Sequence, residues 1–158
     1  MRNILFFVLM AVCIACNQSS ENIDLKKFTP PVVVDTTDPG SLSFIKGWKN
    51  KYPEEVNMFD HPVIENRLSA LLDAEYDLLK ANWNVQIPFE EEQGIFHTGG
   101  CKKNDCPAFH SMIYFDIEAN SINVVIMKDR SYKLYVEKDT IQLPEGMKKD
   151  LMITKGNL

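Results

Sequence analysis

The chain has 158 residues, 45% of them hydrophobic and 25% charged, which is typical of one globular domain and not of a disordered or membrane-embedded chain. Its formal net charge is −5 at pH 7. An acidic chain disfavours nucleic acid as a partner, because phosphates attract a basic surface. The same charge is compatible with a basic protein partner.

The N-terminus has the three parts of a bacterial export signal: a positive Arg2, an apolar stretch over 4–14, and a small Ala15 before the cut. The apolar stretch is shorter than the ~20 residues that span a bilayer. The cut site resembles a bacterial lipobox, Cys13-Ile14-Ala15-Cys16, in which Cys16 is the acylated residue. We predict a lipoprotein signal peptide over 1–15 and a lipid anchor at Cys16. The alternative is an ordinary signal cut nearby, which would leave Cys16 as a free thiol.

The four cysteines can then be assigned one by one. Cys13 leaves with the signal peptide and Cys16 carries the lipid, so only Cys101 and Cys106 remain. Exported compartments are oxidising, and two thiols this close in sequence are expected to pair there. The sequence therefore predicts a disulfide between Cys101 and Cys106.

Residues 16–40 are predicted to be a lipid-anchored flexible linker, because they show no helical periodicity and contain Pro30-Pro31. A folded domain is expected over 41–158. Its first element is a short helix over 42–51, capped by Ser41 and ended by Tyr52-Pro53.

A longer helical stretch follows Asp60, which is a suitable capping residue, and Asp73 could divide this stretch into two helices. Apolar residues recur along it at helical spacing, which predicts one face packed against a sheet. These residues are Ile64, Leu68, Leu71, Leu72, Tyr76, Leu79 and Trp83.

From Val85 the hydrophobic period changes from 3.6 to 2, which predicts strands. Short connections require consecutive strands to pair antiparallel. The acidic run Glu90-Glu91-Glu92 is predicted to lie in a turn with Gly94. The expected strands are 85–89, 94–100, 111–117, 122–127 and 132–136, followed by a helix over 144–152. This order predicts an α+β fold: an antiparallel meander sheet with the N-terminal helices packed on one face.

The disulfide would close a loop of four residues, Lys102, Lys103, Asn104 and Asp105. So short a crosslink contributes less than the ~3 kcal/mol of a 15-residue loop, so its role is better explained as shaping the loop. Gly99-Gly100 before it and Pro107 after it predict a sharp, projecting turn. A rigid polar tip of this kind can enter a concave site at low entropic cost. The alternative is a bridge that only staples a hairpin corner.

The loop is similar to the Cys-Lys-Pro-His-Asp-Cys loop of the inhibitor of vertebrate lysozyme (Ivy) family, and four of the six positions match. The leucine-rich stretch over 67–76 also resembles a helix of more distant relatives, so that the resemblance covers about 60–137. It implies an Ivy-like domain over 41–158 that is an exported inhibitor and not an enzyme. It also implies a lysozyme-like protein partner, whose cleft the loop plugs, and a place in the cell envelope, in the periplasm or on the outer membrane.

The loop departs from the family pattern at two positions. The family histidine aligns with Asn104, whose amide can donate a hydrogen bond but carries no charge. Lys103 replaces the family proline, and with Lys102 it could compensate as a pair of cations beside the two carboxylates of a lysozyme. The departure also allows another binding role, such as immunity to a wall-degrading toxin, or a structural one.

No enzyme, cofactor or metal is predicted. The sequence has no Gly-x-Ser-x-Gly, no His-Glu-x-x-His and no phosphate or dinucleotide loop. His97 and His110 flank the loop, but with Asp105 they fit no known metal-binding spacing, and we expect them to be surface histidines of strands.

Overall fold

The computed structural model describes residues 32–33, 40–129 and 131–156. The predicted signal peptide, the lipid anchor at Cys16 and most of the predicted linker lie outside the described residues. No helix in the described ranges is long and apolar enough to cross a membrane.

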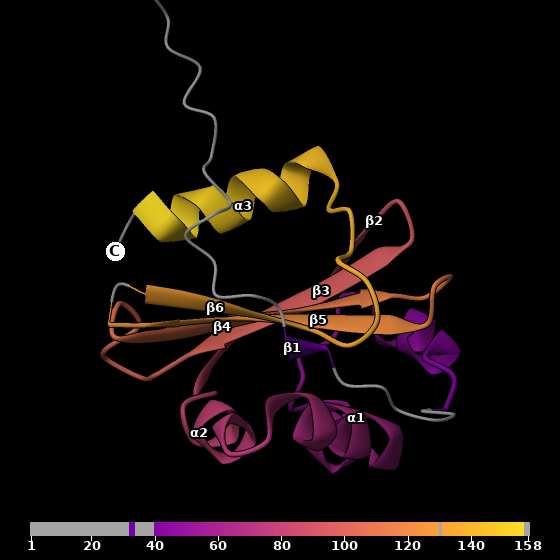
Figure 1. Cartoon of the computed structure of the whole chain (residues 1–158), viewed down its shortest axis with the longest axis horizontal. Coiled ribbons are helices and arrows are strands. Elements are labelled where there is room, and N and C mark those ends of the chain that lie inside the picture. Colours follow the sequence, from indigo (N-terminus) through magenta and orange to yellow (C-terminus); the bar gives the residue numbers. More distant parts are fainter. Residues whose placement is uncertain (1–31, 34–39, 130, 157–158) are drawn as a thin grey trace, which may run out of the picture.

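A six-stranded sheet forms the centre of the molecule, in the order β1-β6-β5-β4-β3-β2 (Figure 1). Five consecutive strands pair antiparallel as a meander, which confirms the predicted α+β class. These strands are β2 Val85–Glu92, β3 Ile95–Cys101, β4 Phe109–Asp116, β5 Ser121–Lys128 and β6 Ser131–Val136. The short β1, Val32–Val33, pairs parallel with β6 and comes from the segment predicted as linker.

Helices cover both faces of this sheet. Two 3₁₀ helices and two α-helices precede the meander, and one α-helix follows it. They are η2 Ser43–Trp48, η3 Met58–Asp60, α1 Pro62–Leu72, α2 Glu75–Ala81 and α3 Glu145–Gly156. In Figure 1, α1 and α2 lie below the sheet and α3 lies above it. The prediction that the N-terminal helices pack on one face is confirmed, and the C-terminal helix covers the opposite face.

Each face of the sheet has its own hydrophobic core, because side chains alternate between the faces along a strand. Ile113 and Phe115 of β4 pack with the helical stripe, all of which is buried as predicted. Met112 and Tyr114 of the same strand pack on the other side, where Met147 of α3 joins them. The period-2 pattern thus predicts the orientation of β4 correctly. In β2 the predicted face is interrupted by a register shift between Ile87 and Glu90, so that Phe89 is buried while Val85 and Ile87 are exposed.

The first helix is shorter and tighter than predicted. The sequence predicts a helix over 42–51, whereas the structure has the 3₁₀ helix η2, Ser43–Trp48. Gly47 lowers helix propensity inside this segment. Beyond it, the Asn50 N–H donates to Phe89 O and the Phe89 N–H donates to Lys51 O, both at 2.8 Å. These bonds draw the chain onto the outer edge of β2 and end the helix early.

The long helical stretch divides at Asp73, which takes a positive φ of 48° between α1 and α2. The predicted cap is wrong by one residue. Asp60 ends η3, and His61 is the N-cap of α1 with Pro62 at the first helical position. A proline is favoured there because its missing N–H would have no helical partner.

The acidic run Glu90-Glu91-Glu92 lies in β2 and not in a turn, contrary to the prediction. The turn is made by Gln93 and Gly94, which have φ values of 54° and 83°. Two positive φ values in a two-residue connection define the hairpin turn whose twist matches the strands. β2 is an edge strand, where charged side chains are well tolerated.

Candidate functional site: a disulfide-closed loop

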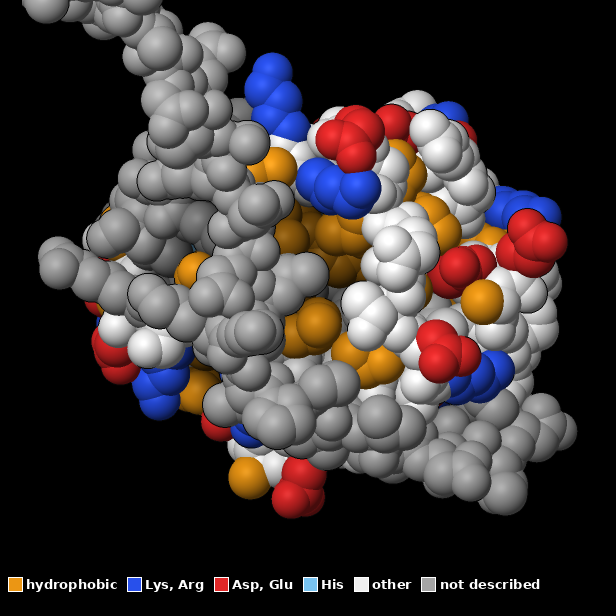
Figure 2. All heavy atoms as spheres, turned by 45° about the horizontal axis from the view of Figure 1, so that its top comes forward, with side chains coloured by type: hydrophobic (Ala, Val, Ile, Leu, Met, Phe, Trp, Pro, Cys, Tyr) orange, Lys and Arg blue, Asp and Glu red, His pale blue; other side chains and the backbone are white. Residues whose placement is uncertain are grey.

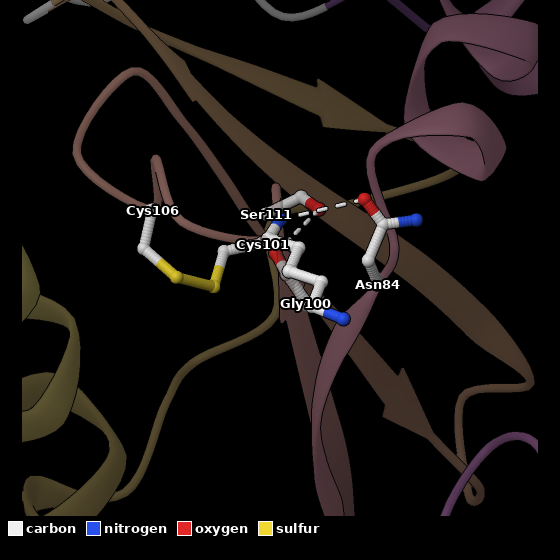
Figure 3. Close-up of a disulfide and its surroundings, with 6 residues drawn as sticks. Asn84, Gly100, Cys101, Cys106 and Ser111 are labelled. Carbon is white, nitrogen blue, oxygen red and sulfur yellow. Dashed lines mark hydrogen bonds between the residues drawn. A yellow bond between two sulfur atoms is a disulfide. The ribbon is translucent and has the colours of Figure 1, made fainter.

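Cys101 and Cys106 form a disulfide at the end of β3, with their Cα atoms 4.9 Å apart. The predicted pairing is confirmed. Figure 3 shows the bridge at the base of the connection between β3 and β4. The connection runs from the last residue of β3, Cys101, to the first residue of β4, Phe109.

Backbone hydrogen bonds fix the conformation of this loop. The Lys102 N–H donates to Phe109 O at 3.2 Å, and the Asp105 N–H donates to Lys102 O at 3.0 Å. Asn104 has a φ of 62°, in the left-handed region that asparagine tolerates better than most residues. The tip is therefore a defined tight turn, and Asn104 supplies the conformation that it requires.

Asn84, between α2 and β2, braces the loop from outside it (Figure 3). Its N–H donates to Cys101 O at 3.1 Å, and its side-chain Oδ1 accepts from the Lys103 N–H at 3.4 Å. The sequence analysis does not identify this residue. An asparagine directly before a strand is too common a signal to indicate a partner nineteen residues away.

Gly99 and Gly100 lie within β3, so they do not form the sharp turn predicted from them. A Cβ on Gly100 would overlap the indole of Trp83, and a Cβ on Gly99 would lie 2.5 Å from Met112 Sδ. The glycines therefore let large side chains approach both faces of the strand closely. The close packing of these side chains on β3 holds the base of the loop in place.

The tip of the loop is polar and exposed. Lys102, Lys103 and Asn104 are exposed, and Asp105 is partly buried. Lys102 Nζ donates to Asp105 Oδ2 at 3.0 Å, and both side chains are about half exposed, at 49% and 46%. Because Lys102 is paired within the loop, Lys103 is the cation of the tip with the greater freedom to meet a partner.

The two histidines beside the loop are less exposed than predicted. His97 on β3 is buried and His110 on β4 is half-buried, because α3 and its connection cover this face of the sheet. Burial lowers the pKa of both imidazoles. Within the part of the chain that the structure describes, neither His110 nor Asp105 belongs to a group that could hold a metal ion.

The fold and the loop together define a small α+β domain with an exposed loop that a disulfide closes. The family model for the inhibitor of vertebrate lysozyme (Ivy) matches residues 63–157, which is more than half of the chain. The chain belongs to this family. The match includes the loop and the whole meander, and it extends through α3, beyond the segment that the sequence resemblance covers. No curated protein and no solved structure matches the chain.

Family membership carries a general functional assignment. Members are inhibitors and not enzymes, with lysozyme as the protein partner, and they act in the periplasm or cell envelope. This agrees with the expectation drawn from the loop sequence.

Proposed function

We propose that this protein inhibits a lysozyme-like glycosidase by inserting the loop 101–106 into its substrate cleft. The observation that carries the proposal is a loop that is crosslinked at its base and exposed at its tip. A preorganised loop loses little conformational entropy on binding, so more of its contact energy appears as affinity. Inhibition would be stoichiometric and by occlusion.

The chemistry of the tip suits a cleft with two carboxylates. A glycosidase of this kind holds its scissile bond between two acidic side chains. Lys103 offers an ammonium group and Asn104 offers amide N–H donors, and both side chains are exposed. Asp105 would act within the loop by orienting Lys102. Lys103 then supplies the charge that Asn104 lacks.

We also propose that the domain is anchored to a membrane through lipid on Cys16, on the strength of the export signal and lipobox-like cut site. Labelling cells with a radioactive fatty acid tests this directly. The wild-type protein should be labelled and Cys16→Ser should not be. Equal labelling of both proteins would overturn the anchor.

The test of inhibition is a titration of lysozyme activity on bacterial cell walls with a soluble chain that begins at Asn17. Inhibition should saturate near one inhibitor per enzyme. Lys103→Ala with Asn104→Ala should weaken it by about tenfold or more, because the charge-assisted hydrogen bond of Lys103 and the amide hydrogen bond of Asn104 are both lost.

The matched control is Lys46→Ala. Lys46 is also an exposed lysine, but it lies in η2, whose N-cap Leu42 is bonded to Asn120 at the far end of β4 from the loop. This variant should inhibit normally. An unchanged affinity of the loop variant would exclude the loop as the contact. A failure to inhibit c-type, g-type and bacterial lysozymes alike would exclude the proposed function.

A further inference from the structure

A buried histidine with one unsatisfied ring nitrogen lies on the α3 face of the sheet. His97 of β3 is only 3% exposed, and its Nδ1 has no hydrogen-bond partner in the described part of the chain. Its Nε2 lies 3.8 Å from Glu90 Oε2, beyond hydrogen-bonding distance. A buried polar group is normally satisfied, so this imidazole needs an explanation.

Two elements bring carboxylates to this histidine. Glu90 lies directly opposite His97 in the β2–β3 register and therefore on the same face of the sheet. Asp150 comes from α3. Gly146, four residues earlier on that helix, packs so closely on β2 that a Cβ there would lie 2.5 Å from Glu92 Oε2. One helical turn later the same face of α3 brings Asp150 to His97.

We propose that Glu90, His97 and Asp150 form a binding site for a divalent metal ion of the zinc type. One ligand atom from each of the three residues lies within 4.8 Å of the others. Around zinc, with bonds of ~2.0–2.2 Å, ligand atoms lie ~3–4 Å apart. Glu90 and Asp150 are exposed, and a binding ion would bring their carboxylates over the remaining distance toward the fixed imidazole, in exchange for the interaction that Asp150 already makes.

The ligand set favours zinc over the hard cations. Calcium and magnesium prefer sites built from oxygen alone, whereas a neutral imidazole suits zinc and similar transition metals. Burial lowers the pKa of His97, although Glu90, Asp150 and Glu92 act in the opposite direction. A neutral ring is the form that binds a metal.

A metal at this position would join the β2–β3 hairpin to the C-terminal helix. The packing of α3 rests on a small apolar cluster that includes Met147 and Ile95, and Asp150 lies on an exposed part of the helix. An ion that binds only the folded protein raises its stability by mass action. The site does not depend on the proposed function of the loop.

Zinc chloride titrated into the purified, EDTA-treated protein tests the site by calorimetry and by thermal unfolding. We expect one ion per chain and a higher Tm. Glu90→Gln and Asp150→Asn keep the shape of the side chain, and each should weaken zinc binding by about tenfold or more through the loss of one ligand. Asp77→Asn, an exposed carboxylate on α2 at the opposite face of the sheet, should bind as the wild type does.

No zinc binding would overturn the proposal. So would binding that Glu90→Gln and Asp150→Asn leave unchanged, because the ion would then lie elsewhere. Magnesium chloride at the same concentration should give no rise in Tm, and a rise equal to that with zinc would also contradict the assignment of the ligand set.

Discussion

Arg67 of α1 is only 1% exposed, and hydrogen bonds to protein groups satisfy its buried guanidinium group. Its Nε donates to Glu137 Oε1 at 2.8 Å and its Nη2 to the second carboxylate oxygen. Its Nη groups also donate to Gly40 O at 3.0 Å and to both the side chain and the backbone carbonyl of Asn120. Glu137 in turn accepts from the Ile122 N–H at 3.0 Å. The buried charges are therefore paired and hydrogen-bonded, as their desolvation requires.

Arg67→Met should lower the free energy of unfolding by about 3–5 kcal/mol, because it leaves Glu137 buried without its counter-charge. Urea unfolding followed by circular dichroism measures the loss. The double variant Arg67→Met with Glu137→Leu removes both charges and should recover part of the stability. A single variant that loses less than about 1 kcal/mol would contradict this role, since that is within the range of an exposed ion pair.

Gly100→Ala should destabilise the protein by about 1–3 kcal/mol, because its methyl group would overlap the Trp83 indole and force the core to shift. Chemical unfolding and tryptophan fluorescence report the change. The control is Gly47→Ala in η2, where a Cβ meets nothing within 4 Å and the backbone is not left-handed. That variant should be neutral or slightly stabilising. Equal effects of the two substitutions would refute the close packing at Gly100.

At the scale of elements, the disulfide shapes the loop more than it stabilises the domain. Replacing both Cys101 and Cys106 by serine should cost about 2 kcal/mol or less, from the small chain entropy of so short a loop. Urea unfolding should show a cooperative transition with an unchanged slope. Loss of inhibition by this variant then reports on the loop and not on unfolding. A variant without a cooperative transition would show that the bridge is needed for the fold itself.

The faces of β4 and β5 that meet the α1–α2 side could be predicted, because side-chain alternation along a strand follows from which residues are apolar. Phe115 and Val124, for example, are apolar and both are buried in the hydrophobic cluster on the α1–α2 side of the sheet. The acidic run of β2 was misassigned because β2 is an edge strand, where three charged side chains can be accommodated, and the sequence does not reveal which strand lies at the edge. Its true turn, Gln93-Gly94, carries two left-handed conformations, one of which Gly94 adopts without steric cost.

The position of the loop could be predicted from its two cysteines, but the residues that hold the loop in place could not be predicted. Asn84 and Trp83 brace the loop only because α2 ends beside β3, and this is set by tertiary packing. The pairing of Lys102 with Asp105 depends on the turn at Asn104, which the spacing of charges does not reveal.

At the scale of the whole molecule, α3 converts a two-layer arrangement into three layers (Figure 1). The sequence predicts this helix but not the face that it covers. Figure 2, with the α3 side turned forward, shows Lys and Arg side chains standing beside Asp and Glu side chains. The burial of His97 and His110 follows from this cover, and so does their departure from the surface positions predicted for them.

Stability should therefore depend on pH through His110. Its pKa is lowered by burial in the folded protein, whereas the unfolded chain has the ordinary value of about 6.5. Below that pH the unfolded chain binds more protons than the folded one, so the free energy of unfolding should fall as the pH drops. Urea unfolding at several pH values from about 7.5 to 5.5 measures the slope.

The matched variant is His110→Phe, which keeps a planar ring of similar size without a proton to bind. Its stability should fall less steeply than that of the wild type over the same pH range. Parallel curves for the two proteins would show that His110 does not contribute to the pH dependence.

The contacts of Arg67 also bear on how the chain assembles. Its partners Gly40, Asn120 and Glu137 lie 27, 53 and 70 residues away in sequence, so closing this network requires almost the entire domain to be in place. Contacts of such long range are slow to form because loop closure must precede them. The hairpins of the meander, which need only neighbouring residues, are expected to form earlier. The hydrogen bonds of Arg67 would then form late in folding, after the transition state, and they would mainly slow unfolding.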